Sequence, residues 1–331
     1  MAMTISFGRR KALAIAGGAV VAAATSRPSL AQQLPSGTIR MLVGFPAGGG
    51  SDVMARIIVE KLKEKTGLNV IVDNRPGNSG NLACEMLKGG PADGSMLMFG
   101  TSATTVAQRV TRKQLQYDVE KDLVTIGLAG TVSVACVVSS KIGVKTFPEF
   151  VEWLKKNPKH QNFGTTAMGS MTHFFGVMLG KELGIPLEPI AYKGAGPLIA
   201  DVTAGHATAG CGGVSDFLTH HRADKMRIIL ISSPKRVSSA PELPTIAELG
   251  YPKLNYEGFY GFYGPSKMSP ALVNAWNREL RAVLELPETR QRLQGVGLEV
   301  QTSTPQELFT RQANLTTYMT SLMKAAGYEP E

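Results

Sequence analysis

The chain has 331 residues, of which 43% are hydrophobic and 18% charged, and its formal net charge is +9. This length is sufficient for two lobes that each bury a core. The basic excess is mild and no stripe of Lys and Arg runs along the chain, which excludes a nucleic-acid-binding protein and suits either an anionic ligand or solubility.

The first 31 residues are arranged like a signal peptide. A positive segment, Gly8-Arg9-Arg10-Lys11, precedes small apolar residues at 12–25, and Ser29-Leu30-Ala31 supplies a cleavage pattern. The apolar run is too short to remain in a bilayer, and it lacks the polar face that a buried N-terminal helix would show. We expect cleavage after Ala31 and a mature protein that is free in the periplasm and not embedded in a membrane. Loss of four cationic side chains lowers the formal charge from +9 to +5.

The export route stays open. Arg9-Arg10, the weakly apolar run and Arg27 together resemble a twin-arginine signal. Ala12 stands where that signal usually has an aromatic residue, so the general secretory route remains an alternative. The residue directly after the predicted cut is Gln32 rather than a cysteine, and a lipid anchor is therefore not expected.

The apolar pattern predicts alternating strands and helices from residue 38 onward. In the first part, strands are expected at 38–44, 69–72 and 95–99, with helices over 52–65 and through Leu87. The pattern restarts after Leu123, with strands at 132–138, 162–165, 187–191, 208–211 and 226–232 and helices at 148–156, 170–183 and 197–204. Helices that begin at Pro270, Pro287 and Pro305 complete the chain. This order implies mostly parallel sheets with helices on both faces.

Three cysteines, Cys84, Cys136 and Cys211, remain in the mature chain. An odd number allows at most one disulfide in an oxidising compartment, and no Cys-x-x-Cys or Cys/His spacing predicts a metal site. Cys136 and Cys211 lie in apolar runs typical of buried strands. We expect free, unreactive thiols in preference to a disulfide.

A glycine-rich loop, residues 44–51, joins the first predicted strand to the first predicted helix. Backbone N–H groups and the helix dipole at such a turn favour an anion. The loop almost matches a phosphate-binding loop, but Gly50 stands where a lysine is required, and G-x-G-x-x-G is not matched either. We interpret it as an anion site rather than a nucleotide site. A plain tight turn that needs positive φ is the alternative.

The second half repeats this arrangement at residues 165–173, where hydroxyl groups stand at the start of a helix. Ser170 is either a helix N-cap or a ligand contact. In an open α/β sheet, ligands bind beyond the carboxyl ends of the strands, where both loops, Thr101-Ser102 and residues 212–216 would lie. We expect two helix N-termini to hold a carboxylate from opposite sides of a cleft.

Three other polar residues have two interpretations each. Asp52 is a partner of the helix dipole or receives an ammonium group of the ligand. His173 lines the cleft or is a buried structural histidine. Lys193 is a surface charge or reaches the cleft from the end of a strand.

The sequence contains none of the catalytic motifs that we considered. The stretches Gly213-Val214-Ser215-Asp216-Phe217 and Gly77-Asn78-Ser79-Gly80-Asn81 each lack the last glycine of a nucleophile elbow. Neither H-E-x-x-H nor H-x-E with C-x-x-C occurs. We expect a binding protein without cofactor or metal. An enzyme on the same fold is the alternative, because triads form in space rather than in sequence.

Several motifs stand in order along the mature chain. They are Phe45-Pro46-Ala47-Gly48-Gly49-Gly50-Ser51-Asp52, Asp73-Asn74-Arg75-Pro76-Gly77, Pro91-Ala92-Asp93-Gly94, Tyr192-Lys193-Gly194 and the stretch 241–250. Together they resemble the substrate-binding proteins of tripartite tricarboxylate transporters, the Bug or TctC family. The resemblance covers essentially the whole mature chain.

This resemblance implies an α/β fold of the type II periplasmic-binding-protein class, with two doubly wound lobes joined by two crossing strands. Lobe 1 would comprise residues 32–131 and 233–331, and lobe 2 residues 132–232. Family members bind di- and tricarboxylates, acidic amino acids or aromatic acids. Integral-membrane transporter subunits would be the partners of this chain, which we expect to be a monomer.

The resemblance and the strand-end loops together predict the ligand-binding residues. They are Phe45, Ala47, Gly48, Gly49, Asp52, Thr101, Ser102, Gly169, Ser170, Met171, Thr172, His173, Tyr192, Lys193 and Ser215. The chain departs from the family pattern at Ala191, where proline is usual, and at Ala167-Met168 and Met171. Bulkier apolar groups there suit an aromatic or partly apolar acid better than citrate. A sensor that presents its ligand to a membrane protein is the alternative to an importer.

Overall fold

The computed structural model describes residues 34–330, apart from the side chains of residues 325 and 326. Residues 34–331 form one compact unit, and both lobes lie within it. The predicted signal peptide and its cleavage after Ala31 fall outside the described residues. Between residues 34 and 330, no helix combines the length and the apolar character that crossing a membrane requires.

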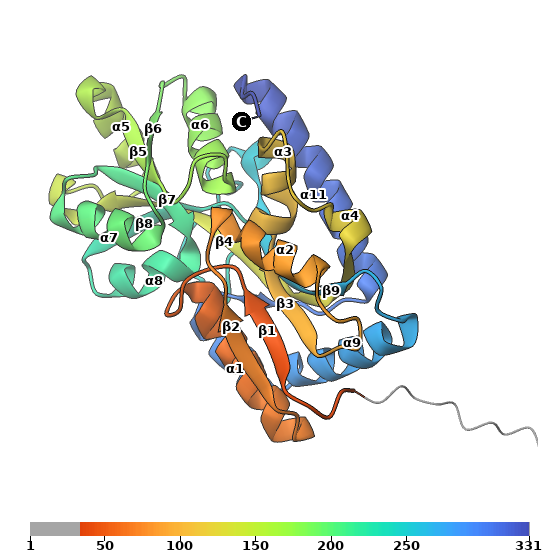
Figure 1. The fold of residues 1–331 in the computed structure, drawn as a ribbon. Helices are drawn as coiled ribbons and strands as arrows, with labels where there is room; N and C mark the ends of the chain where they lie inside the picture. The colour runs from red at the N-terminus through yellow and green to blue at the C-terminus, as the bar shows by residue number, and fades with distance from the viewer. Residues whose placement is uncertain (1–33, 331) are drawn as a thin grey trace, which may run out of the picture. The chain divides into compact units, whose positions relative to one another are not determined.

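Lobe 1 is built on parallel strands. β1 (Ile39–Val43) lies between β2 (Val70–Asn74) and β3 (Met96–Thr101) and pairs with both in parallel. α1 (Gly50–Thr66) and α2 (Asn81–Lys88) connect the three strands (Figure 1). The strand–helix alternation predicted for this region is confirmed. The pattern arises because the apolar faces of a parallel sheet must be covered by helices.

Lobe 2 repeats the pattern. β5 (Asn162–Thr165) pairs in parallel with both β6 (Glu188–Ala191) and β7 (Ala209–Gly213). The helices of this part of the chain are α5 (Phe147–Lys156), α6 (Met171–Leu183), α7 (Ala195–Ala204) and α8 (Val214–Arg222). α6 ends at Gly184, whose φ of 65° lies in the left-handed region that glycine adopts without strain. This is the stop that the sequence predicts.

Two long strands carry the chain between the lobes. β4 (Leu123–Ser139) pairs with β9 (Glu257–Pro265) along its first part and with β7 and β8 (Met226–Ile231) along its last part. These pairings are antiparallel, so the expectation of mostly parallel sheets is wrong for the centre of the molecule. A chain that crosses from one lobe and returns must run both ways there. The predicted strand at 132–138 is only the last part of β4, and β9 was not predicted.

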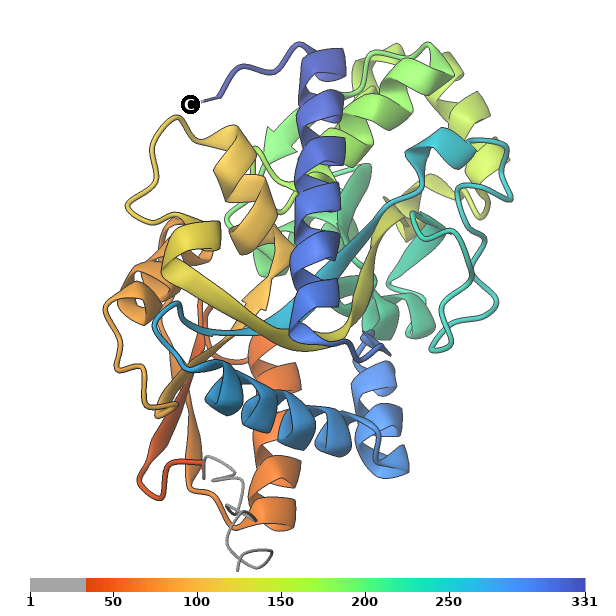
Figure 2. The ribbon, with the colours of Figure 1, turned by 90° about the vertical axis from the view of Figure 1, so that its right-hand side faces the viewer.

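The C-terminal part returns to lobe 1. It contains α9 (Pro270–Leu284), α10 (Pro287–Gly295), β10 (Glu299–Val300) and α11 (Pro305–Ala326). Each helix begins at a proline, as predicted. Figure 2 shows α11 running across β4 and β9, the strands that join the lobes.

Short helical segments complete the chain. They are η1 (Asn78–Gly80), η2 (Ala103–Ala107), α3 (Gln108–Thr111), α4 (Val119–Asp122), η3 (Ser140–Ile142), η4 (Pro158–His160) and η5 (Pro252–Leu254). η1 and η2 lie at the carboxyl ends of strands in lobe 1, close to the predicted site. They fix the backbone around it.

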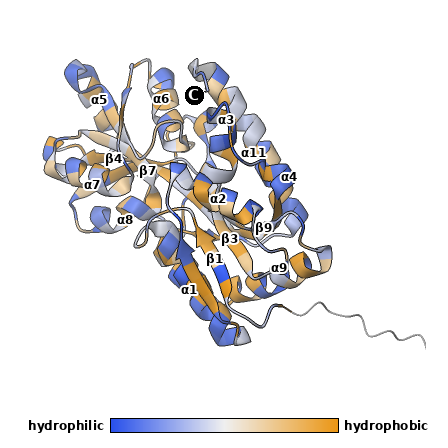
Figure 3. Ribbon diagram, in the orientation of Figure 1, coloured by the Kyte–Doolittle hydropathy of each residue, from blue (hydrophilic) through white to orange (hydrophobic). Residues whose placement is uncertain are grey.

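The apolar core extends through both lobes. One cluster belongs to lobe 1, and β1 and β3 within that lobe are largely hydrophobic (Figure 3). A second cluster contains side chains of both lobes, which makes the apolar interior continuous between them. A third belongs to lobe 2 and includes Val237, Ala240 and Leu243, from the segment that follows β8. That segment therefore packs with lobe 2 before the chain enters β9.

Candidate functional site

The loop between β1 and α1 lies at the carboxyl end of a parallel strand, as predicted. Ala47, Gly48 and Gly49 are exposed, whereas Phe45 is half-buried and its carbonyl accepts a hydrogen bond from the side chain of Asn74 (3.0 Å). Gly48 has φ = 81°, a conformation that few residues other than glycine adopt. The positive φ that a plain tight turn requires, the alternative to an anion site, is therefore present at Gly48.

Asp52 is a buried residue that bonds to the backbone of this loop. Its Oδ2 accepts the Gly48 N–H (2.9 Å) and the Arg56 Nε–H (2.9 Å), and the side chain is 3% exposed. Burial raises the pKa of the Asp52 carboxyl, but hydrogen bonds from Arg56, Gly48 and Asn74 outweigh it, and the pKa falls below its usual value. Asp52 is thus an anion in the first turn of α1, where it also complements the helix dipole.

The hydrogen bonds of this loop show which N–H groups are available to a ligand. Gly48 donates to Asp52, and Gly49 donates to the Pro46 carbonyl at 3.4 Å. Among the described residues, no side chain caps α1, and the N–H groups of Gly50 and Ser51 have no acceptor. The first turn of a helix leaves such donors unpaired, and they favour an anion. The donors expected at Gly48 and Gly49 are therefore displaced by two residues.

Hydroxyl groups cluster at the start of α6. The Ser170 Oγ accepts the His173 N–H (3.4 Å), donates to the Ala167 carbonyl (2.6 Å) and lies 2.8 Å from the Thr172 Oγ1. The Thr172 Oγ1 is also 2.8 Å from the Thr165 Oγ1 and 3.1 Å from the Thr166 Oγ1. Ser170 is thus the N-cap of α6, and its hydroxyl belongs to a bonded cluster at the start of this helix.

Two residues of the same loop lie in the interior. His173 is 4% exposed, accepts the Gly169 N–H at its Nδ1 (3.2 Å), and packs against Phe174 and Tyr328. Met171 is 6% exposed and belongs to the core cluster that both lobes share. The structural interpretation of His173 is supported, and the apolar wall expected from two methionines reduces to Met168, which is exposed.

The segment after β6 is attached to the same loop. The Tyr192 and Gly194 N–H groups donate to the Thr165 and Thr166 carbonyls (2.9 and 3.0 Å). The Tyr192 hydroxyl donates to the Asp201 carboxylate (2.8 Å), and burial and Asp201 together raise its pKa to about 12. Lys193 is exposed. Tyr192 therefore fixes the backbone of this segment, and Lys193 extends from it.

Thr101 and Ser102, at the end of β3, are buried and bonded within lobe 1. The Thr101 Oγ1 accepts the Thr104 N–H (3.2 Å), and the Ser102 Oγ accepts the Phe259 N–H (3.1 Å). Both hydroxyls thus hold the β3 end against η2 and β9. They stay ligand candidates only through their remaining hydrogen-bonding capacity.

The start of α8 brings the two lobes into contact. A methyl group added at Gly50 would lie 3.6 Å from the Ser215 Oγ, and one added at Gly297 would lie 2.8 Å from the Ser215 Cα. Ser215 therefore stands between the start of α1 and the turn that follows α10. On the lobe 2 side, a methyl group at Gly212 would lie 3.4 Å from the Thr166 side chain, which connects this point to the hydroxyl cluster.

Three residues near this contact were not among the predicted ones. The Ser51 Oγ lies 3.1 Å from the Tyr260 hydroxyl, and the Tyr260 ring stacks on Phe99. Asp216 accepts the Gly213 N–H (2.9 Å), and burial raises the pKa of its carboxyl to about 6. Tyr260 belongs to β9, whose sequence Glu257–Pro265 alternates aromatic pairs with glycines. Those aromatic pairs are the signal that could have revealed the strand.

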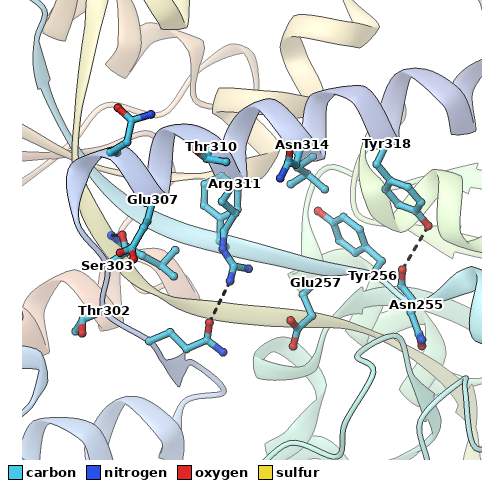
Figure 4. A pocket seen from close by; sticks show the side chains of 15 residues that line it. Asn255, Tyr256, Glu257, Thr302, Ser303, Glu307, Thr310, Arg311, Asn314 and Tyr318 are labelled. Atoms are coloured by element: carbon cyan, nitrogen blue, oxygen red, sulfur yellow. Dashed lines mark hydrogen bonds between the residues drawn. The ribbon is translucent and has the colours of Figure 1, made fainter.

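A separate cavity of about 760 Å³ lies where α11 crosses β4 and β9, the strands that join the lobes (Figure 4). Glu257 of β9 and Arg311 of α11 line it, and Arg311 donates to the Gln301 side chain (3.3 Å). None of the predicted ligand residues lines this cavity. Within residues 34–330, no group of three or more His, Cys, Asp or Glu side chains could hold a metal ion.

Comparison with known proteins agrees with this architecture. A family model described as "Tripartite tricarboxylate transporter family receptor" matches residues 54–327. BugT of Bordetella pertussis is 29% identical over 274 residues, 82% of this chain and 84% of BugT. The solved structure of the periplasmic binding protein BugD is 25% identical with a TM-score of 0.80, covering 90% of this chain and 100% of BugD. The structure of R. palustris Rpa4515 with adipate is 24% identical with a TM-score of 0.85, covering 90% and 100%.

Proposed function

The chain belongs to the tripartite tricarboxylate transporter receptor family, and from this premise we propose that it captures a small carboxylate in the periplasm and delivers it to integral-membrane transporter subunits. Rpa4515, which shares the fold, was solved with the dicarboxylate adipate. Bound dicarboxylate in a protein of the same architecture supports the chemical class of the ligand. The proposal therefore names the class of ligand, a small carboxylate, and not one particular acid.

The meeting of two helix starts at Gly50 and Ser215 is the observation that supports this function most directly. The Gly50 and Ser51 N–H groups lack acceptors among the described residues, and the positive end of the α1 dipole lies at the same place. We propose that these donors and the Ser215 hydroxyl bind one oxygen-rich end of the ligand. Ala47, Gly48 and Gly49 would then shape the rim.

The other side of the proposed site is the hydroxyl cluster at the start of α6. Ser170 and Thr172 belong to this cluster, and Lys193 is exposed on the neighbouring segment. A carboxylate held between these groups and α1 would contact both lobes. Ligand binding would therefore stabilise the closed arrangement of the lobes.

Calorimetry with matched acids and primary amides tests this function. We expect the mature chain, residues 32–331, to bind one or more carboxylic acids and to bind the corresponding amide about 100-fold more weakly or worse. The reason is that each charge-assisted hydrogen bond contributes roughly 1.5–3 kcal/mol, and two are lost. Equal affinities for acid and amide would overturn the anion site.

Two variants locate the site within the chain. Arg311→Ala removes the cation of the cavity beside α11 and should leave affinity for the acid unchanged, because that cavity shares no residue with the proposed site. Lys193→Ala should weaken binding less than threefold if backbone donors neutralise the acid. If Arg311→Ala lowered the affinity for the acid by as much as replacing the acid with its amide, the carboxylate would bind in this cavity instead.

We also propose that the protein does not transform its ligand. The support for this proposal is that the matching family is one of transporter receptors. NMR of ligand recovered after prolonged incubation should show it unchanged. Product formation that scales with protein concentration would indicate an enzyme on this fold.

A further inference from the structure

Two of the three cysteines stand opposite one another in the structure. Cys136 of β4 is the register partner of Cys211 of β7, in an antiparallel pair that runs from Val134–Gly213 to Val138–Ala209. The side chains of directly opposed residues point to the same face of a sheet. Both cysteines are free thiols in the structure, and their side chains are 2% and 1% exposed.

The hydrogen-bond pattern determines which kind of pair this is. The Ser139 N–H donates to the Thr208 carbonyl (2.9 Å), so these two opposed residues form a hydrogen-bonded pair. Hydrogen-bonded and non-hydrogen-bonded pairs alternate along antiparallel strands. Cys136 and Cys211 lie three positions further along the ladder and therefore form a non-hydrogen-bonded pair. There the Cα atoms are closest, about 4.5 Å apart, inside the roughly 4.4–6.8 Å that a disulfide spans.

Cys84 has different surroundings. It lies on α2, and its Sγ is 3.8 Å from the Met98 Sδ of β3. The neighbouring Cys136 and burial raise the pKa of the Cys211 thiol, and burial raises the pKa of the Cys84 thiol to about 12. This cysteine is a built-in reference thiol for experiments on the other two.

We propose that Cys136 and Cys211 form a disulfide in the exported protein, an inference that rests on the proposed periplasmic location. Two S–H bonds are replaced by one S–S bond, and a protein or small-molecule disulfide accepts the two electrons and two protons as a pair of thiols. Because both thiols are buried in the native fold, exchange occurs while β4 and β7 pair. The finished bond is then shielded from reductants.

The bond would fasten elements that matter for ligand capture. β4 crosses between the lobes, and β7 leads directly into Gly213 and the start of α8, where Ser215 lies. A covalent connection between these strands would hold the Ser215 side of the site at a constant position relative to the hinge. It would also close a loop of about 75 residues in the unfolded chain, which stabilises the native state.

Thiol counting on the exported protein is the primary test. The full chain with its leader is expressed, the periplasmic fraction is quenched in acid, and the denatured protein is alkylated with N-ethylmaleimide before and after reduction. We expect one label without reduction and three with it, and a cross-linked peptide pair that contains Cys136 and Cys211. In the Cys84→Ser variant we expect no label without reduction and two labels after it. Three labels without reduction, or a cross-link that includes Cys84, would overturn the proposal.

A refolding test separates this inference from the proposed function. Residues 32–331, produced reduced in the cytosol, are unfolded and refolded with oxidised glutathione. The same single pairing is expected, whatever the export route, and reduction under mildly denaturing conditions should lower Tm by about 5–10 °C. The Cys136→Ala/Cys211→Ala variant is the control and should not respond to reductant. Failure to form the pair in refolded, ligand-binding protein would overturn the disulfide and leave the carboxylate function intact.

Discussion

At the scale of single residues, the two acids near the contact of α1 and α8 show how surroundings decide charge. The Asp52 carboxylate accepts hydrogen bonds from Arg56 and Gly48, and its pKa lies below the usual value. Asp216 accepts a hydrogen bond from the Gly213 N–H, and burial raises the pKa of its carboxyl to about 6. Asp52 is therefore ionised at neutral pH, whereas Asp216 ionises only against a free-energy penalty.

Asp216→Asn should change the pH dependence of stability. The folded-state pKa of Asp216 is raised above the unfolded value of 3.8, so its stabilising contribution is complete below pH 3.8 and is lost as pH rises through about 6. Asparagine keeps an acceptor for the Gly213 N–H and cannot ionise. We expect a difference of only about 0.5 kcal/mol at pH 4 and a variant more stable by about 1–3 kcal/mol at pH 7.5. Urea denaturation at both pH values measures this, and a pH-independent difference would contradict it.

Ser170→Ala separates helix capping from ligand contact. Loss of the N-cap should lower the free energy of unfolding by about 1 kcal/mol. Thr146→Ala is the matched control, because Thr146 caps α5 with the same geometry (Oγ1 to the Glu149 N–H, 3.4 Å) away from the site. Both variants should lose similar stability in denaturant titrations, but only Ser170→Ala should lose carboxylate affinity, by about tenfold. Equal affinities in the two variants would assign Ser170 to capping alone.

At the scale of elements, the α1 start is the part of the site with the most specific requirements. A methyl group at position 50 would contact the Ser215 Oγ of α8, and the Ser51 Oγ lies 3.1 Å from the Tyr260 hydroxyl of β9. The helix start is thus held by contacts from lobe 2 and from a hinge strand. These contacts fix the orientation of the Gly50 and Ser51 N–H groups, although no side chain among the described residues caps α1.

Substitutions at Gly50 should show a graded effect on binding. In Gly50→Ala the added methyl would lie 3.6 Å from the Ser215 Oγ, an ordinary contact, so a loss of affinity below tenfold is expected. Gly50→Val fills the space between the helix starts and should abolish binding in calorimetry. Gly37→Val, where an added Cβ meets nothing within 4 Å, controls for the substitution itself. Full affinity in Gly50→Val would exclude this contact from the site.

At the scale of the whole molecule, β4 and β9 connect lobes that also touch each other elsewhere. Ser238, from the segment packed on lobe 2, bonds to the Glu299 carboxylate of β10 through its N–H and hydroxyl (2.8–3.0 Å). On the other side of the lobes, Tyr328 packs on His173 of α6. Motion about the hinge would have to break these contacts, which makes closure a transition between two states.

Small-angle scattering should detect closure. We expect the radius of gyration of residues 32–331 to fall when a carboxylate saturates the protein, because binding energy favours the arrangement in which both lobes contact the ligand. The corresponding amide, which should not bind, serves as the control. An unchanged profile with binding confirmed by calorimetry would show that the lobes do not move.

Much of the fold follows from local sequence. The apolar run within 38–44 predicts the strand observed at Ile39–Val43, and Pro270, Pro287 and Pro305 mark helix starts, because these signals act within one or two turns of chain. β9 escaped detection because glycines interrupt its aromatic pairs and lower its apparent strand character. The extent of β4 was missed for a related reason. Its two parts pair with different sheets, and no local pattern records that change of partner.

The sequence by itself determined the family, the alternation of strands and helices, and the two strand-end loops that would face a ligand. Only the tertiary structure decided which groups in those loops remain available. Gly48, Gly49 and Gly169 donate their N–H groups within the chain, Met171 and His173 are buried, and Ser51, Asp216 and Tyr260 join the site region. Hydrogen-bond partners and burial depend on segments hundreds of residues apart, such as Ser51 with Tyr260. A local sequence pattern specifies the backbone of a loop but not the neighbours that consume its donors.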